Sequence, residues 1–292
     1  MQEYELTFKS LNSENYAKPI TVLVMQPDKM DEHTGVMVFT HGWGGARFQH
    51  ADKMAWTADR FNVVCLSAEY RMSGFDFNPV TGQGAYRPYD ASFMQTFDVL
   101  NALRFVLGQY PSLNRRRIFH YGGSQGGHIC LLSSIFAPNT FAFVYASCPL
   151  VRITPKKAAW SGREFAPYEL SVRNVLEHSG LIRCPVYLEY GTADETVDCT
   201  EHSELLIQQL RRQNHALQVE VYEGGGHSLE PTITKLAAFQ KMAPTPLQTL
   251  TSDTQDDFAA RSLVRIPCGE KTLHIDWSKP TADIHLVQWA AD

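Results

Sequence analysis

The chain has 292 residues, of which 44% are hydrophobic and 20% are charged. It can therefore bury a large core, and its composition excludes an intrinsically disordered chain. The formal net charge of −5 comes from scattered charges and argues against a nucleic-acid partner, and no apolar stretch approaches the roughly 20 residues of a membrane-spanning helix.

Strands and helices are expected to alternate along most of the chain. Apolar and polar residues alternate in two segments, residues 4–9 and 20–25, which predicts edge strands. The later strands are expected at 36–40, 63–67, 117–121, 141–147, 186–190 and 218–222. The helices are expected at 48–61, 91–109, 124–136 and 201–214. This order predicts an α/β fold, a mostly parallel central sheet with helices on both faces.

Two segments depart from this alternation. Residues 150–183 exceed a simple connection and carry Trp160, Phe165 and Tyr168, so we interpret them as a small cap beside the site, with plain surface packing as the alternative. Residues 244–257 read as a linker after the last core helix. Beyond it, three segments alternate like short strands: 263–268, 271–277 and 284–289. The main domain is expected at 1–247 and a β-rich extension of unassigned role at 248–292.

A candidate nucleophile lies between an expected strand and an expected helix. Residues 122–126 read Gly-Gly-Ser-Gln-Gly, a G-x-S-x-G pattern. A sharp turn between strand and helix needs neighbours without side chains, which Gly122 and Gly126 supply, and it would present the hydroxyl of Ser124 outward. Ser124 is therefore the expected catalytic nucleophile.

A serine hydroxyl needs a base and an orienting acid, and both follow in the order Ser, Asp, His. Asp194 comes after the strand at 186–190, although Asp198 lies close enough to compete. His227 follows three consecutive glycines, which a purely structural histidine would not need. His202 and His215 read instead as solvent-facing residues of a polar helix. The expected catalytic residues are Ser124, Asp194 and His227.

Acyl transfer also needs two backbone N–H groups aimed at the developing oxyanion. Residues 41–45 read His-Gly-Trp-Gly-Gly directly after a buried strand. The expected donors are the amides of Trp43 and Gln125, with a non-catalytic glycine-rich turn as the alternative at Trp43. The aromatic side chains Trp43, Trp160, Phe165 and Tyr168 are the expected substrate-binding residues.

Taken together, these motifs resemble the α/β-hydrolase superfamily over roughly residues 35–242. The stretch Gly-Ser-Gln-Gly-Gly at 123–127 resembles the elbow of acetyl xylan esterases and cephalosporin C deacetylases, as does Gly82-Gln83-Gly84, although Thr81 and Ser228 depart from their pattern. Residues 70–74, Tyr-Arg-Met-Ser-Gly, resemble prolyl oligopeptidase-like hydrolases, which usually carry an N-terminal propeller that this chain has no room for. Either resemblance implies a Ser-Asp-His triad and no cofactor.

The expected function is hydrolysis of a small-molecule carboxylic ester with a short, acetyl-like acyl group. The first alternative is a peptidase or aminopeptidase, for which Glu164, Glu169 or Glu195 could bind the substrate amine. The second is a binding protein that has lost catalysis. Dehalogenases and epoxide hydrolases are disfavoured because they carry Asp at the elbow.

The remaining features suggest no further chemistry. Six scattered cysteines lack metal-ligand spacing, so buried free thiols and no metal are expected. The N-terminal residues lack a signal-peptide profile, which predicts a cytoplasmic protein. The basic run at 115–117 is assigned no function. We expect no nucleic-acid or membrane partner, and the oligomeric state stays open, a homo-oligomer included.

Overall fold

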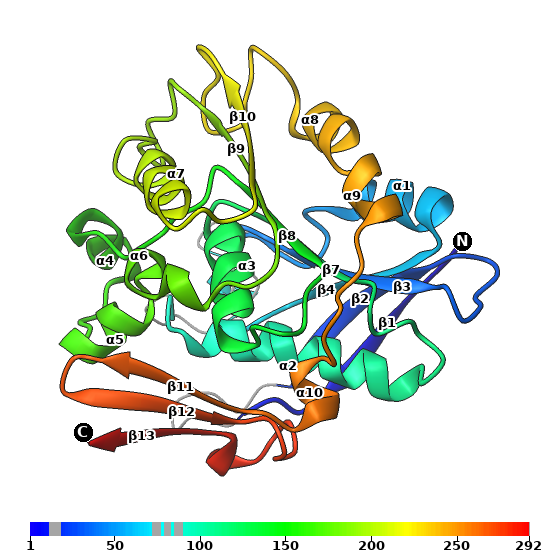
Figure 1. Ribbon diagram of the computed structural model, residues 1–292. Helices are drawn as coiled ribbons and strands as arrows, with labels where there is room; N and C mark the ends of the chain where they lie inside the picture. Colours follow the sequence, from blue (N-terminus) through cyan, green and yellow to red (C-terminus); the bar gives the residue numbers. More distant parts are fainter. Residues whose placement is uncertain (12–18, 72–76, 79–82, 85–89, 292) are drawn as a thin grey trace.

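The computed structural model describes residues 1–11, 19–71, 77–78, 83–84 and 90–291 (Figure 1). One sheet holds, in spatial order, β1 (Gln2–Phe8), β2 (Ile20–Gln26), β4 (Val63–Ala68), β3 (Gly35–Thr40), β7 (Ile118–Gly123), β8 (Phe143–Ser147), β9 (Val186–Gly191) and β10 (Leu217–Tyr222). The β1–β2 and β2–β4 pairs are antiparallel and the other pairs are parallel. The predicted α/β fold with a mostly parallel sheet is confirmed.

Helices cover both faces of this sheet. The longer ones are α1 (Ala51–Phe61), α2 (Met94–Gln109), α3 (Gln125–Phe136), α7 (Ser203–Arg212) and α8 (Lys235–Met242). Residues of β3 alternate between the two faces: Val36 and Val38 join the cluster formed with α2 and α3, whereas Met37 and Phe39 join the one formed with α1 and α8. The strand reads as continuously apolar because both of its faces are covered.

The predicted start of α2 needs a small correction. We expected the helix from residue 91, but Ala91 has a positive φ of 42° and the helix begins at Met94. The hydroxyl of Ser92 accepts a hydrogen bond from the N–H of Met94 at 3.1 Å, which satisfies one of the free donors of the first turn.

Residues 150–183 form short helices: α4 (Pro155–Ser161), α5 (Pro167–Val172), α6 (Val175–His178) and the 3-10 turn η2 (Ser179–Leu181). They follow β8 and precede β9, so they leave the sheet at its carboxyl edge and return to its opposite edge. Thr154 caps α4 by accepting a hydrogen bond from the N–H of Lys157, and Pro155 occupies the first turn, where a missing N–H costs nothing. The two-residue strands β5 (Phe77–Asn78) and β6 (Gln83–Gly84) pair separately.

The C-terminal extension is a three-stranded antiparallel sheet of β11 (Leu263–Cys268), β12 (Lys271–Asp276) and β13 (Val287–Ala291). The predicted third strand is shorter than expected, because residues Ile284–Leu286 form a 3-10 turn, η3. The sheet packs beneath α2 and α5 (Figure 1). Trp277, 1% exposed, anchors it: its indole N–H donates to the carbonyl of Phe136 at the end of α3, at 2.9 Å.

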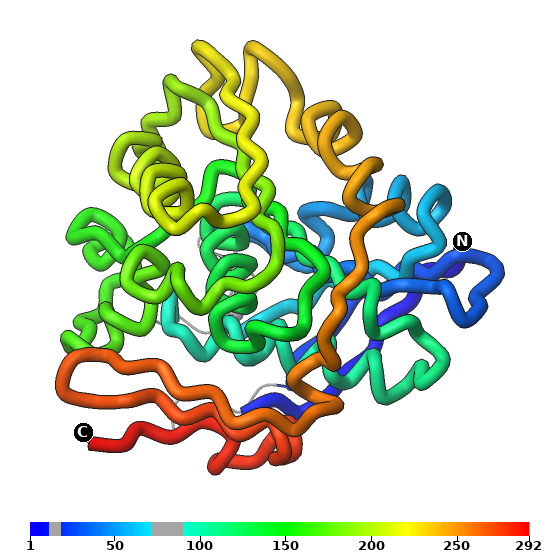
Figure 2. The backbone as a smooth tube through the Cα atoms, in the orientation of Figure 1, coloured from blue at the N-terminus to red at the C-terminus, as the bar shows by residue number. Residues whose placement is uncertain are grey.

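The expected linker is in fact held to the body of the protein. It contains α9 (Pro244–Thr249), and α10 (Asp257–Ala260) begins at its end, so the tube from α9 to α10 crosses the molecule in one pass (Figure 2). This segment is held by the three arginines of the basic run at 115–117, to which no function was assigned from the sequence. Arg115 donates twice to Asp256, Arg116 to the carbonyl of Ser252, and Arg117 to that of Leu247.

Candidate active site

Ser124 occupies the turn between β7 and α3, as the sequence predicted. Its φ of 58° and ψ of −121° are rare for a residue with a side chain, and such strain is typical of functional turns. A Cβ atom on Gly122 would lie 2.1 Å from the carbonyl oxygen of Gly126, and one on Gly126 would lie 2.0 Å from that of Thr40. The turn therefore requires both glycines, for the predicted steric reason.

We expect Gly126→Ala to lower the free energy of unfolding by about 1–3 kcal/mol and to abolish activity, because the new methyl group displaces the end of β3 or the turn itself. Gly108→Ala is the matched control, since a Cβ atom there meets nothing within 4 Å. In the helix it should stabilise by about 0.5–1 kcal/mol. Chemical denaturation of both variants tests this, and equal stability of the two would contradict it.

The predicted acid and base lie together. The Nδ1 atom of His227 and the Oδ2 atom of Asp194 are 2.7 Å apart, and the other carboxylate oxygen accepts the N–H groups of Thr196 and Val197 at 2.9 and 2.8 Å. Burial by itself would raise the pKa of Asp194, but the hydrogen bonds from His227, Val197 and Thr196 outweigh it and lower the pKa below its ordinary value. Asp194 is therefore ionised wherever an ordinary carboxyl is, and the stabilisation from its ionised form is lost only when the pH falls through that lowered pKa.

Strand register explains why residues 33 positions apart meet. β9 and β10 are parallel neighbours with Gly191 opposite Tyr222, so the loops that follow them leave the same edge of the sheet. The N–H of Ala193 donates to the carbonyl of Gly225 at 2.9 Å. A Cβ atom on Gly191 would lie 2.1 Å from that carbonyl oxygen, so a larger residue would push the two loops apart.

The alternatives to this pair have other roles. Asp198 is exposed and accepts the N–H groups of Thr200 and Glu201, which makes it a turn residue. The prediction that His202 faces solvent is wrong: it is 2% exposed, and its Nδ1 atom accepts the N–H of Val151 at 3.2 Å. The prediction from the polar helical pattern failed because this histidine precedes α7 and packs against the chain that follows β8.

The expected oxyanion loop lies against the nucleophile turn. A Cβ atom on Gly42 would lie 3.5 Å from the Cβ atom of Ser124, so Trp43 follows directly after the point of contact. The hydroxyl of Tyr70 donates to the carbonyl of His41 at 3.0 Å, and the two rings stack with centroids 4.0 Å apart. These contacts fix the loop, while the roles of the Trp43 and Gln125 amides stay predictions.

The four aromatic residues predicted to bind substrate do not form one group. The rings of Trp43 and Trp160 meet edge to face with centroids 6.3 Å apart, which links α4 to the oxyanion loop. Phe165 lies under the guanidinium of Arg163. Tyr168 packs 4.8 Å from Trp289 of the C-terminal sheet instead of facing Trp43, so its environment gives no support to a substrate-binding role.

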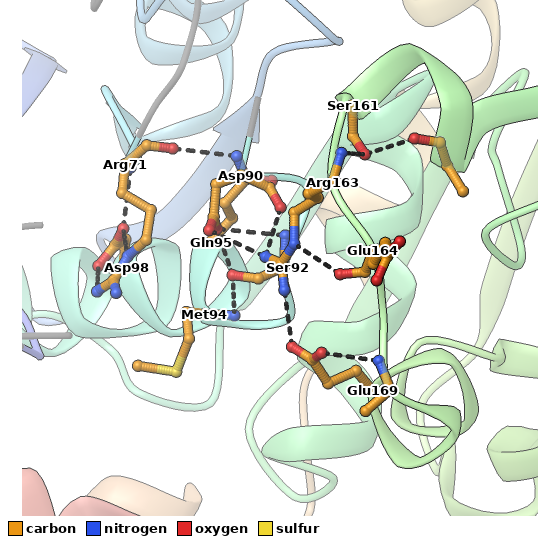
Figure 3. A network of polar contacts seen from close by, with 12 residues as sticks. Arg71, Asp90, Ser92, Met94, Gln95, Asp98, Ser161, Arg163, Glu164 and Glu169 are labelled. Carbon is orange, nitrogen blue, oxygen red and sulfur yellow. Dashed lines mark hydrogen bonds and ion pairs between the residues drawn. The ribbon is translucent and has the colours of Figure 1, made fainter. Parts of the chain in front are cut away.

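A buried polar network extends from Gln125 away from the nucleophile. The side-chain amide of Gln125 donates to Gln95 at 2.6 Å, and that of Gln95 donates to the carbonyl of Arg71 at 3.0 Å. Arg71 in turn forms a buried ion pair with Asp98, with two guanidinium contacts of 2.8 Å (Figure 3). Arg71 is described here, but the rest of its predicted motif, residues 72–74, lies outside the described residues, as do Thr81 and Gly82.

The same region shows how the expected cap is tied down. Arg163, which follows α4, donates to the carbonyl of Asp90 at 2.9 Å and to the carboxylate of Glu169 at 2.9 Å (Figure 3). Glu169 also accepts the N–H of Ala166 and so completes the first turn of α5. Glu169 is therefore already engaged by a cation, whereas Glu164 and Glu195 are exposed.

Two cations near the site, the buried Lys157 and the half-buried Arg152, were not predicted from the sequence. Arg152 and Lys157 lie on the segment that leaves the carboxyl edge of β8. The signal that could have found them is their place just after a buried strand, where side chains converge on an α/β site.

A buried thiol also lies at the site. Ligand atoms of Cys148, Asp194 and His227 all lie within 4.8 Å of one another. Burial raises the pKa of Cys148 to about 12, so the thiol is neutral, and the two other residues are occupied with each other. All six cysteines are buried and free, as expected. Across the described ranges, no helix has the length and hydropathy that crossing a bilayer demands.

A comparison with models of protein families identifies the family of this chain. The model of the prolyl oligopeptidase family matches residues 94–243, just over half of the chain, and this range contains Ser124, Asp194 and His227. The chain belongs to the prolyl oligopeptidase family. No curated protein matches it. As a member of this family the chain is an enzyme, a serine hydrolase with the α/β-hydrolase fold.

Solved structures share the fold of this prolyl oligopeptidase family member. An acylaminoacyl peptidase of Pyrococcus horikoshii is 16% identical, with a TM-score of 0.63, over 77% of this chain and 38% of its own. A puromycin-hydrolysing peptidase of Mycobacterium tuberculosis is 19% identical, with a TM-score of 0.61, over 78% and 36%. Dipeptidyl peptidase 4 of Porphyromonas gingivalis is 17% identical, with a TM-score of 0.60, over 84% and 35%.

These identities show the fold alone, and the chain spans little more than a third of each solved structure. The predicted kinship with prolyl oligopeptidase-like hydrolases is confirmed. The resemblance to acetyl xylan esterases and cephalosporin C deacetylases rested on the elbow, a stretch too short to separate the two groups. The matches support the peptidase alternative better than the acetylesterase prediction.

Proposed function

We propose that this enzyme is a serine peptidase that hydrolyses amide bonds of peptide substrates through an acyl-enzyme. The observation that carries the proposal is the family match across residues 94–243, which encloses the strained Ser124 turn and the bonded pair of Asp194 and His227. The peptidases that share the fold support it.

In this proposal, the hydroxyl oxygen of Ser124 attacks the scissile carbonyl carbon. Because Nδ1 of His227 faces Asp194, Nε2 is the ring nitrogen that takes the hydroxyl proton and passes it to the leaving amine. The amides of Gln125 and Trp43 are the proposed donors to the oxyanion. Water then cleaves the acyl-enzyme, with His227 as base, and releases the acid and free Ser124.

Among the acidic residues considered for binding a free substrate amine, none offers a buried carboxylate without a partner. Glu169 is held by Arg163, and Glu164 and Glu195 are exposed. A substrate with a blocked or internal amino group therefore suits the site better than one with a free N-terminus. This favours acylated peptides over an aminopeptidase substrate.

The short-acyl ester stays a second candidate on one observation. The indole rings of Trp43 and Trp160 meet beside the expected oxyanion loop, which would limit the acyl group. The same residues would cleave activated esters in either case, because an ester has the better leaving group. Ester turnover alone therefore cannot separate the two functions.

The test is a comparison of acetylated peptidyl p-nitroanilides, free aminoacyl p-nitroanilides and p-nitrophenyl acetate, with Ser124→Ala as the background control. We expect turnover of the acetylated anilides that disappears in the control. Ester turnover without hydrolysis of any anilide in a set that varies the residue before the scissile bond would overturn the peptidase proposal. It would favour the esterase.

A further inference from the structure

Arg152 and Lys157 are two cations that form no ion pair with a carboxylate of the described residues. The Nε atom of Arg152 is buried without a hydrogen-bond partner, and the structure gives its guanidinium no ion pair with any described residue. Lys157 is 3% exposed, and its ammonium lies 3.4 Å from the ring centroid of Trp160. No carboxylate of the described chain lies within ion-pair distance of that ammonium.

Two other arginines have buried acidic partners, whereas the fully buried Arg173 contacts the Nδ1 atom of His128. Arg71 faces Asp98, and Arg115, which is partly exposed, faces the buried Asp256. Removing a cation from water without compensation is costly, so such groups are normally paired. Two cations on one short segment, neither paired with a carboxylate of the described residues, therefore favour an anion supplied by a ligand.

The surroundings place these cations beside the candidate active site. Lys157 lies against Trp160, whose ring meets Trp43 on the oxyanion loop. His202 accepts the N–H of Val151, next to Arg152. Burial, with smaller contributions from the charges of Arg152 and Lys157, lowers the pKa of His202 to about 4, while Asp198 and Asp194 oppose this shift. Lys157 therefore lies within electrostatic range of Asp194, and Arg152 lies within electrostatic range of His202.

We propose that Arg152 and Lys157 bind a carboxylate of the substrate next to the scissile bond, so that the enzyme prefers acidic peptides. The inference rests on the proposed function. An arginine offers a fork of N–H groups and a lysine a point charge, and together they match a carboxylate. The indole ring of Trp160 holds the ammonium in place and lets it turn from ring to ligand.

Two sources of the carboxylate fit this chemistry: the side chain of Glu or Asp before the scissile bond, or the C-terminus of a short peptide. The first arm compares acetyl-Ala-Glu and acetyl-Ala-Gln p-nitroanilides. The second compares acetylated tripeptides with a free and with an amidated C-terminus. In one of the two arms we expect the charged substrate to have at least about tenfold higher kcat/KM.

The single variants Arg152→Met and Lys157→Met should each lower kcat/KM for the preferred substrate part of the way, and the double variant should lower it to about the level of the uncharged analogue. Turnover of that analogue should stay within about twofold of wild type. Lys156→Met, on the exposed side of the same helix, is the matched control and should keep the preference. Labelling of Ser124 by a fluorophosphonate at the wild-type rate shows that each variant is folded.

Charge at Lys157 gives an independent readout. Burial, with a smaller contribution from Lys156, lowers the pKa of Lys157 to about 8, and Asp194 opposes this shift. The charged groups that act on it from other elements are Asp194 and, when protonated, His202, and Arg152 also acts on His202. Lysine is charged below its pKa, so part of the preference should fade as the pH rises through about 8, while Arg152 keeps the remainder.

The experiments distinguish failure of the proposed carboxylate site at Arg152 and Lys157 from failure of the peptidase proposal. Two results would overturn the carboxylate site alone. One is peptide hydrolysis without a charge preference in either arm, and the other is a preference that both methionine variants retain. If no peptide is cleaved, acetylglutamate and acetylglutamine are compared as protectants of Ser124 against the fluorophosphonate. Protection by acetylglutamate but not by acetylglutamine, weakened in Lys157→Met and lost in the double variant, would uphold the proposed carboxylate site, and equal protection by the two compounds would overturn it.

Discussion

Asp194→Asn should lower kcat by about 10⁴-fold with little change in KM. One oxygen of Asp194 is held by the N–H groups of Thr196 and Val197, so the asparagine oxygen stays there and its NH₂ group turns to Nδ1 of His227. The imidazole must then accept at Nδ1 and carry its proton on Nε2. In that tautomer His227 cannot remove the proton of Ser124.

Steady-state kinetics with the best substrate tests this prediction, and thermal denaturation checks that the variant is folded. Asp198→Asn is the control, because Asp198 is exposed and bonds only its own turn. It should keep kcat within about twofold of wild type. A large loss in Asp198→Asn with near-normal kcat in Asp194→Asn would exchange the roles of the two residues.

The second large effect is on stability. Asp98→Ala should lower the free energy of unfolding by about 3–5 kcal/mol, because it leaves the buried cation of Arg71 without its counterion. Both residues are at most 1% exposed, and the carboxylate also accepts the backbone N–H of Arg71 at 2.9 Å. Chemical denaturation measures the loss. Asp253→Asn is the control, since its ion pair with Arg116 is exposed and should contribute little.

Asp98→Ala should also impair catalysis in the protein that remains folded. The carbonyl of Arg71 accepts a hydrogen bond from Gln95 (Figure 3), and Gln95 accepts one from the side chain of Gln125, the residue after the nucleophile. Movement of Arg71 therefore reaches the first turn of α3. A stability indistinguishable from wild type would show that Arg71 finds another partner and would contradict the assigned role of the pair.

The sequence was informative wherever local chemistry decides the structure. Gly122 and Gly126 mark the nucleophile turn because only glycine avoids the clash there, and the apolar strands follow from a sheet covered on both faces. Asp194 and His227 each follow a strand, and parallel neighbours bring their loops to one edge. These features could be predicted from spacing alone.

Other features depend on contacts between distant parts of the chain. Tyr168 packs on Trp289, and Arg115 pairs with Asp256. No local sequence pattern predicts either contact. His202 reads as a surface residue but is buried beside the chain after β8. The esterase prediction relied on a short elbow that both groups share, whereas the family match draws on residues 94–243.

The most direct test is labelling of the folded protein with a fluorophosphonate, followed by peptide mapping of wild type and His227→Ala. We expect a single adduct on Ser124 that forms far more slowly in the variant, because the imidazole activates the hydroxyl. An adduct on another residue, or labelling of Ser124 at the same rate in both proteins, would contradict it.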